Sequence, residues 1–127
     1  MDVQIRVVIA DDDEDFLDTA HRWLAKRGAE VRSCGDAETC LELFSCETPD
    51  VAVIDGKLPG NDGLWLVQQL RQTSPDVPLI MLSGNVDPAF AVDVYEAGVL
   101  RFLLKPCRLS DVEAAVCEAV EQRADEI

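Results

Sequence analysis

The feature of the sequence that most constrains the fold is a short apolar run that ends in a carboxylate, residues 51–55 (VAVID). The four residues before Asp55 have no polar side chain and three of them are β-branched, which is typical of a strand buried on both faces of a parallel sheet. Residues 56–63 hold three glycines, a proline and an Asn-Asp pair, so they are predicted to form a loop. Asp55 is therefore expected at the carboxyl edge of a sheet, where open α/β folds carry their ligand sites.

Length and composition limit the class of protein. With 127 residues and 48% hydrophobic content, we expect residues 1–127 to form a single domain around one core. The sequence has no run of 18 apolar residues and no basic-then-apolar leader, which predicts a cytoplasmic protein without a membrane partner. A net charge of −14 repels phosphate backbones, so we expect no direct binding of nucleic acid. The cysteines lack metal-ligand spacing and are expected to be reduced and mostly buried: Cys34, Cys40, Cys46, Cys107 and Cys117.

Predicted strands and helices alternate along the chain. Apolar runs predict strands at residues 5–10, 30–34, 51–55, 78–83 and 100–104. Helical spacing of apolar residues predicts helices at residues 14–27, after the cap Asp36, at 64–72, from the cap Asp87 to residue 97, and through 112–120.

Five parallel strands joined by helical crossovers give a three-layer α/β fold, with helices on both faces of one sheet. The first and third strands are the most apolar and belong in the middle, whereas the second carries two charges and belongs at an edge. The order 2-1-3-4-5, which is one of the common orders of doubly wound sheets, satisfies this placement, and its switch point lies between the first and third strands. Asp11, Asp12 and Asp55 are then expected to converge on one crevice.

Three carboxylates in one crevice require a cation. At about 5 Å each pair repels by roughly 3 kcal/mol at an effective dielectric near 20. A set of oxygen ligands with room for water suits Mg²⁺ better than zinc. The alternative is that the acids only line a helix N-terminus, where the helix dipole favours them. We favour that alternative for Asp13, Glu14 and Asp15, and the metal site for Asp11 and Asp12, which directly follow a buried strand.

Five short motifs follow the predicted strands in a fixed order. They are Asp11-Asp12, Asp55, residues 58–63 (LPGNDG), Ser83-Gly84 and Lys105-Pro106. No single motif is specific, but together they span nearly the whole chain. In this order the chain resembles the receiver domain of two-component response regulators. The resemblance implies a flavodoxin-like fold of the receiver type.

The resemblance also implies roles for individual residues. Asp55 would be the phosphoacceptor and Mg²⁺ the cofactor. Asp12 would bind Mg²⁺ directly and Asp11 through water, while Asp55 and the backbone carbonyl of Gly56 would complete the protein's share of the ligands. A carboxylate can attack phosphorus when a cation and an ammonium neutralise the charge on the transferring oxygens.

Three further residues take roles by the same resemblance. Ser83 would hydrogen-bond the phosphoryl group and Lys105 would pair with it. Phe102 would change rotamer together with Ser83 on activation. Taken alone, Ser83 is equally a strand-end cap, Lys105 a solvated lysine and Phe102 a core residue.

The partners implied are a sensor histidine kinase or a phosphotransfer protein as phosphoryl donor, and an output domain or effector protein as receiver of the signal. The face formed by the fourth helix, fifth strand and fifth helix would carry that signal, with Leu100 as a partner contact. Such a domain is not an enzyme in the ordinary sense, because it catalyses only its own phosphorylation and dephosphorylation.

Some positions depart from the common pattern of the family. Lys57, two residues after Asp55, puts a second ammonium near the site. By the resemblance, Lys57 and Asn85, which is two residues after Ser83, would border the path of the hydrolytic water and are expected to modulate the lifetime of the phosphorylated state. Leu100-Arg101 stands where many DNA-binding receivers carry an acidic pair used for dimerisation.

Other classes fit the sequence less well. A haloacid dehalogenase-type phosphatase would need a second acid at position 57, which is a lysine. A dinucleotide-binding module would need a Gly-x-Gly-x-x-Gly loop after the first strand, which is followed by aspartates instead. A receiver-like domain that has lost phosphotransfer remains as a further alternative.

Overall fold

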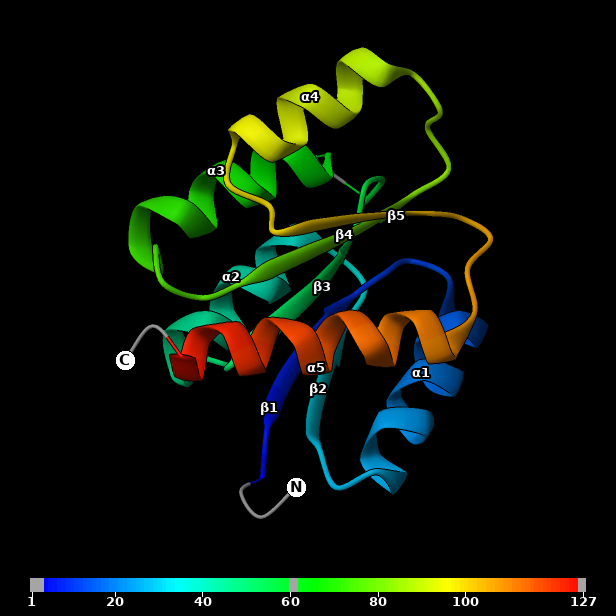
Figure 1. The fold of residues 1–127 in the computed structure, drawn as a ribbon, viewed down its shortest axis with the longest axis vertical. Helices are drawn as coiled ribbons and strands as arrows, with labels where there is room; N and C mark the ends of the chain where they lie inside the picture. Colours follow the sequence, from blue (N-terminus) through cyan, green and yellow to red (C-terminus); the bar gives the residue numbers. More distant parts are fainter. Residues whose placement is uncertain (1–3, 60–61, 126–127) are drawn as a thin grey trace.

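The computed structural model describes residues 4–59 and 62–125, in which strands and helices alternate (Figure 1). The strands are β1 (Arg6–Ala10), β2 (Glu30–Cys34), β3 (Val51–Asp55), β4 (Leu79–Ser83) and β5 (Arg101–Leu104). The helices are α1 (Glu14–Lys26), α2 (Ala37–Cys46), α3 (Gly63–Thr73), α4 (Pro88–Glu96) and α5 (Leu109–Asp125).

The strands form one parallel sheet in the order β2-β1-β3-β4-β5, which confirms the predicted fold and strand order. The charged strand β2 is at an edge, and every residue of β3 and β4 is buried. The predictions for β1, β4 and β5 began one residue too early. Such shifts are normal, because hydrogen-bonded pairing covers fewer residues than the apolar pattern does.

Alternate residues of each strand point to opposite faces of the sheet and build two cores. Val8 and Ile54 belong to the core under α2, α3 and α4, whereas Val7 and Val53 belong to the core under α1 and α5. Figure 1 shows these two helix layers on either side of the sheet. Because all strands are parallel, all their carboxyl ends meet at one edge of the sheet.

Aspartates cap four of the helices. Asp13, Asp36, Asp62 and Asp87 each accept a hydrogen bond from a backbone N–H in the first turn of α1, α2, α3 and α4. The predicted caps Asp36 and Asp87 are confirmed, and Asp13 serves a helix terminus as expected. Among the described residues, none of the helices is both long and apolar enough to cross a membrane.

The expectation that the cysteines are mostly buried is wrong for three of the five, although all five are free thiols. Cys34 and Cys40 are buried beneath α2, but Cys107 and Cys117 are half-buried and Cys46 is exposed. Cys46 is the last residue of α2, and Cys117 lies next to Val116, whose side chain packs in the core under α5. A hydrophobic residue is buried only where its position on the helix faces the core, and these two cysteines lie outside the apolar stripe of their helices.

Candidate functional site

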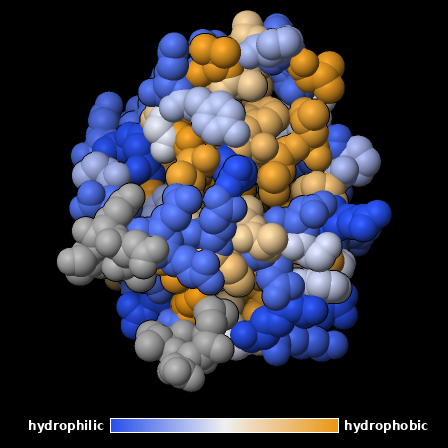
Figure 2. Space-filling model, in the orientation of Figure 1, coloured by the Kyte–Doolittle hydropathy of each residue, from blue (hydrophilic) through white to orange (hydrophobic). Residues whose placement is uncertain are grey.

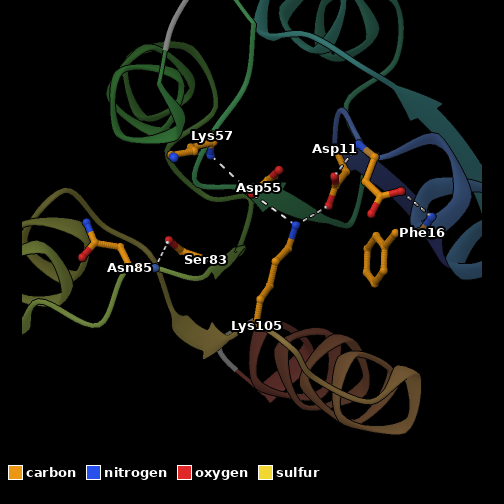
Figure 3. A network of polar contacts seen from close by, with 8 residues as sticks. Asp11, Phe16, Asp55, Lys57, Ser83, Asn85 and Lys105 are labelled. Atoms are coloured by element: carbon orange, nitrogen blue, oxygen red, sulfur yellow. Dashed lines mark hydrogen bonds and ion pairs between the residues drawn. The ribbon is translucent and has the colours of Figure 1, made fainter.

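The carboxyl ends of β1, β3, β4 and β5 bring polar side chains together at one edge of the sheet (Figure 3). Asp11 follows β1, Asp55 ends β3, Ser83 ends β4 and Lys105 follows β5. Each side chain comes from a different strand, so their arrangement is fixed by the strand order and the parallel register rather than by any local segment.

The predicted convergence of Asp11, Asp12 and Asp55 is observed. Their carboxylate oxygens lie within 4.8 Å of one another, a spacing that suits ligation of one metal ion. Asp11 is 1% exposed and Asp55 6% exposed, whereas Asp12 is open to solvent. Two of the three charges are therefore poorly hydrated, and their repulsion is strong.

The ammonium of Lys105 lies between two of these carboxylates. Its Nζ is 3.0 Å from Oδ2 of Asp11 and 3.4 Å from Oδ1 of Asp55. The same Nζ lies 5.4 Å from the centre of the Phe16 ring, a distance at which the ring face attracts a cation. Burial lowers the pKa of Lys105, but its contacts with Asp11 and Asp55 outweigh burial and raise the pKa overall. Lys105 is therefore a fixed positive charge at this site.

Asp55 has an unusual affinity for protons. Burial, and next the charge of Asp11, raise its pKa to about 6. The backbone N–H of Lys57, 3.3 Å from Oδ1, and the ammonium of Lys105 oppose the increase. At neutral pH Asp55 is still mostly ionised, so it is a carboxylate held at high free energy beside a cation.

Ser83 packs closely against the backbone of β3 because the residue after Asp55 is glycine. A Cβ atom on Gly56 would lie 2.9 Å from both Cβ and Oγ of Ser83, closer than such atoms pack. The Ser83 Oγ accepts a hydrogen bond from the backbone N–H of Asn85 at 3.1 Å, so its own proton is available to another acceptor.

The Gly56 carbonyl, expected as a metal ligand, already accepts a hydrogen bond from the backbone N–H of Gly63 at 3.1 Å. Gly63 is the first residue of α3, and a Cβ there would lie 2.5 Å from the Asp55 carbonyl oxygen. The loop between β3 and α3 is thus closed tightly by two glycines. The metal role of Gly56 stays a prediction.

Lys57 and Asn85 border the site, but their side chains do not reach toward Asp55. Lys57 is exposed, and only its backbone N–H contacts the Asp55 carboxylate. Asn85 Oδ1 accepts a hydrogen bond from the Asp87 N–H at 2.9 Å. Figure 3 shows both side chains directed away from Asp55. Their effect on phosphoryl lifetime stays a prediction.

Phe102 lies outside the polar cluster and is half-buried. Its ring packs edge-on against Phe90 of α4, with ring centroids 6.0 Å apart. Phe90 in turn lines the hollow of about 640 Å³ that opens onto Asp12, Asp55 and Lys105. Phe90 and Phe16 were not predicted as neighbours of the site, because both have only the spacing of a helical apolar residue.

Comparison with known proteins identifies relatives. The family model described as the response regulator receiver domain matches residues 7–117. The DNA-binding transcriptional regulator NtrC of Escherichia coli K12 is 32% identical over 114 residues, which are 90% of this chain and 24% of that protein. The response regulator MprA of Mycolicibacterium vanbaalenii is 31% identical over 110 residues, 87% of this chain and 48% of that protein. The chain thus spans about a quarter of NtrC and about half of MprA.

The fold has a close counterpart among solved structures. A CheY-like response regulator receiver domain protein from Methanospirillum hungatei JF-1 matches with a TM-score of 0.94 at 26% sequence identity. The match covers 98% of this chain and 100% of that chain.

The raised pKa of Asp55 predicts how stability depends on pH. An unfolded aspartate has a pKa of about 3.9, so the folded protein binds this proton more tightly than the unfolded chain does. The stabilising contribution of Asp55 is fully present below about pH 4 and is lost as the pH rises through about 6. Asp55→Asn is therefore expected to raise the free energy of unfolding of the metal-free protein by about 1–3 kcal/mol at about pH 7.5, and by little at about pH 4.

Urea unfolding with a chelator at both pH values measures this difference. Asp18→Asn is the matched control, because Asp18 is exposed and pairs only with exposed Arg22 on the same helix. A gain for Asp55→Asn that is equal at the two pH values, or a loss at the higher pH, would contradict the assignment.

Proposed function

The chain belongs to the response regulator receiver domain family, and we propose that it accepts a phosphoryl group on Asp55 with Mg²⁺ as cofactor. The donor is a sensor histidine kinase or a phosphotransfer protein. In this proposal residues 1–127 act as one cytoplasmic receiver domain, and the domain catalyses only its own phosphorylation and dephosphorylation.

One observation carries the proposal: the Lys105 ammonium touches Asp11 and Asp55 at once, across the carboxyl edge of the sheet. If Lys105 only balanced the negative charge of the site, a position beside one of the two carboxylates would be enough. Placed between them, it lies beside the oxygen that would attack phosphorus and beside a carboxylate suited to a metal. The alternative of a haloacid dehalogenase-type phosphatase is not supported, since position 57 carries an exposed lysine in place of its acid.

The residues divide the chemistry of phosphoryl transfer among them. Asp55 attacks the phosphorus atom, the bond from phosphorus to the donor atom breaks, and the leaving donor takes up a proton. Lys105 stabilises the charge that spreads over the phosphoryl oxygens, and Ser83 donates its free hydroxyl proton to one of them. Mg²⁺, when bound by Asp11, Asp12 and Asp55, would neutralise the same oxygens and remove the repulsion among the carboxylates.

The signal leaves the domain through the face formed by α4, β5 and α5. Phe102 connects this face to the site, because its ring contacts Phe90 at the hollow beside Asp55. Leu100 is 37% exposed on this face and is our candidate for a partner contact. The partner is an output domain or a separate effector protein, and with a net charge of −14 this domain itself does not hold nucleic acid.

Incubation with Mg²⁺ and acetyl phosphate tests the proposed function directly. Intact-protein mass spectrometry is expected to detect one added phosphoryl group, which Asp55→Asn abolishes and Lys105→Ala strongly slows. Asp62→Asn, a matched change at the cap of α3, is expected to keep the reaction. Absence of any added mass in the wild-type protein would indicate a receiver fold without phosphotransfer.

Mg²⁺ is expected to stabilise the folded protein. A ligand that binds only the folded state raises stability by mass action, by about 2.7 kcal/mol at a concentration one hundred times its Kd. Thermal melts in millimolar Mg²⁺ are expected to lie above melts in chelator. Asp12→Ala should remove this difference, whereas Asp13→Ala loses only the α1 cap and should keep it. Equal melts of the wild-type protein with and without the metal would refute a Mg²⁺ site.

Lys57 is expected to prolong the phosphorylated state. Its flexible ammonium is attracted to the phosphoryl dianion and then covers the path of the hydrolytic water. Lys57→Ala should shorten the lifetime of phosphorylated Asp55 by about fivefold, which corresponds to about 1 kcal/mol of barrier. Decay of the phosphorylated protein measures the effect, with Lys26→Ala at an exposed position of α1 as the control. Equal or slower decay in the Lys57 variant would show that the ammonium does not shield the bond.

A further inference from the structure

Helix α4 is held to the domain by few buried side chains. Of its nine residues only Val94 is buried, while Val92 and Tyr95 are 54% and 48% exposed. Figure 1 shows α4 beside α3 at the outer end of the molecule, with its C-terminal end leading into β5. A short helix with so little buried apolar surface depends on individual contacts for its position.

Two of those contacts involve the same residue of β5. The Phe102 ring packs edge-on against Phe90 near the start of α4, at 6.0 Å and an interplanar angle of 72°. The Phe102 backbone N–H donates a hydrogen bond to the Tyr95 hydroxyl in the last turn of α4, at 3.1 Å. Phe102 is therefore attached to both ends of α4, once through its ring and once through its backbone.

The hydroxyl contact differs in kind from the ring contact. Strand β5 is at an edge of the sheet, where a backbone N–H on the free side has no strand to bond to. Tyr95 supplies the acceptor in place of a strand. A change of Phe102 rotamer moves the ring without moving the N–H, so the bond to Tyr95 does not depend on the ring and breaks only when α4 moves away from the β5 backbone.

A chain of hydrogen bonds connects Ser83 at the site to the start of α4. The Ser83 Oγ bonds to the Asn85 N–H, and the loop between β4 and α4 continues through the Asn85 contact with Asp87 to the α4 cap. Movement of Ser83 toward a phosphoryl group would pull on this loop, and hence on α4. The Tyr95 hydroxyl opposes that pull at the other end of the helix.

We propose that the Tyr95 hydroxyl is a positioning group that holds α4 in its resting place against β5, and so opposes the conformation that phosphorylation favours. The tether itself is a property of the unphosphorylated protein, whereas its regulatory effect rests on the proposed function. A contact made only in the resting conformation shifts the equilibrium by its own free energy, which a phosphoryl group must overcome.

Tyr95→Phe tests the tether, because it removes the hydroxyl and keeps the ring. Amide hydrogen exchange of the unphosphorylated protein, followed by NMR, is expected to become about threefold to tenfold faster at Phe102 and in the last turn of α4. The Phe102 amide proton should also shift upfield. Val92→Ala, a change at an exposed position of the same helix, should leave the Phe102 amide unchanged. Unaltered exchange and shift at Phe102 in Tyr95→Phe would overturn the tether.

Titration with beryllofluoride in Mg²⁺ tests the regulatory effect. The midpoint of the α4 and β5 response is expected at an about threefold to tenfold lower concentration in Tyr95→Phe, and unchanged in Val92→Ala. A hydroxyl that merely stabilised the fold would lower the melting temperature and leave the midpoint unchanged, which would overturn the regulatory effect. If the wild-type protein shows no response at all, the proposed function and the regulatory effect both fail, while amide exchange still decides the tether.

Discussion

The structure depends on holding like charges together at the ends of adjacent parallel strands. Asp11 and Asp55 are almost completely buried, so water does little to screen them from each other. The cation that offsets their repulsion comes from Lys105, 94 residues after Asp11 in the sequence. Since Lys105 follows the last strand, the charge balance is complete only when the whole sheet has formed. Local segments of the chain cannot supply it.

The sequence was sufficient for the fold and for the centre of the site, for physical reasons. Strands buried on both faces read as unbroken apolar runs, and their relative hydrophobicity places them in the middle or at the edge of the sheet. Once the order is known, the convergence of Asp11, Asp12 and Asp55 follows from parallel geometry. Four further aspartates cap helices, so position relative to a strand or helix end separates the site carboxylates from the rest.

What the sequence could not supply was which side chains touch across the layers. Phe16 and Phe90 lie at the site, yet each has only the helical spacing of a core residue. Nothing in the order of residues distinguishes the Tyr95 hydroxyl on the β5 backbone from that of any exposed tyrosine. The engagement of the Gly56 carbonyl with Gly63 depends on the path of a loop, and periodicity carries no information about loop paths. Such contacts depend on distances between layers.

The closeness of Gly56 to Ser83 means that the site depends on the absence of a side chain at position 56. Gly56 contributes no side-chain atom to the chemistry, yet any larger residue would have to displace Ser83. A mutational scan scored by signalling output would therefore rank position 56 beside Asp55 and Lys105. In such a scan, a position that has no room for a side chain is as intolerant to substitution as a position that carries a reactive group. Only the structure distinguishes the two.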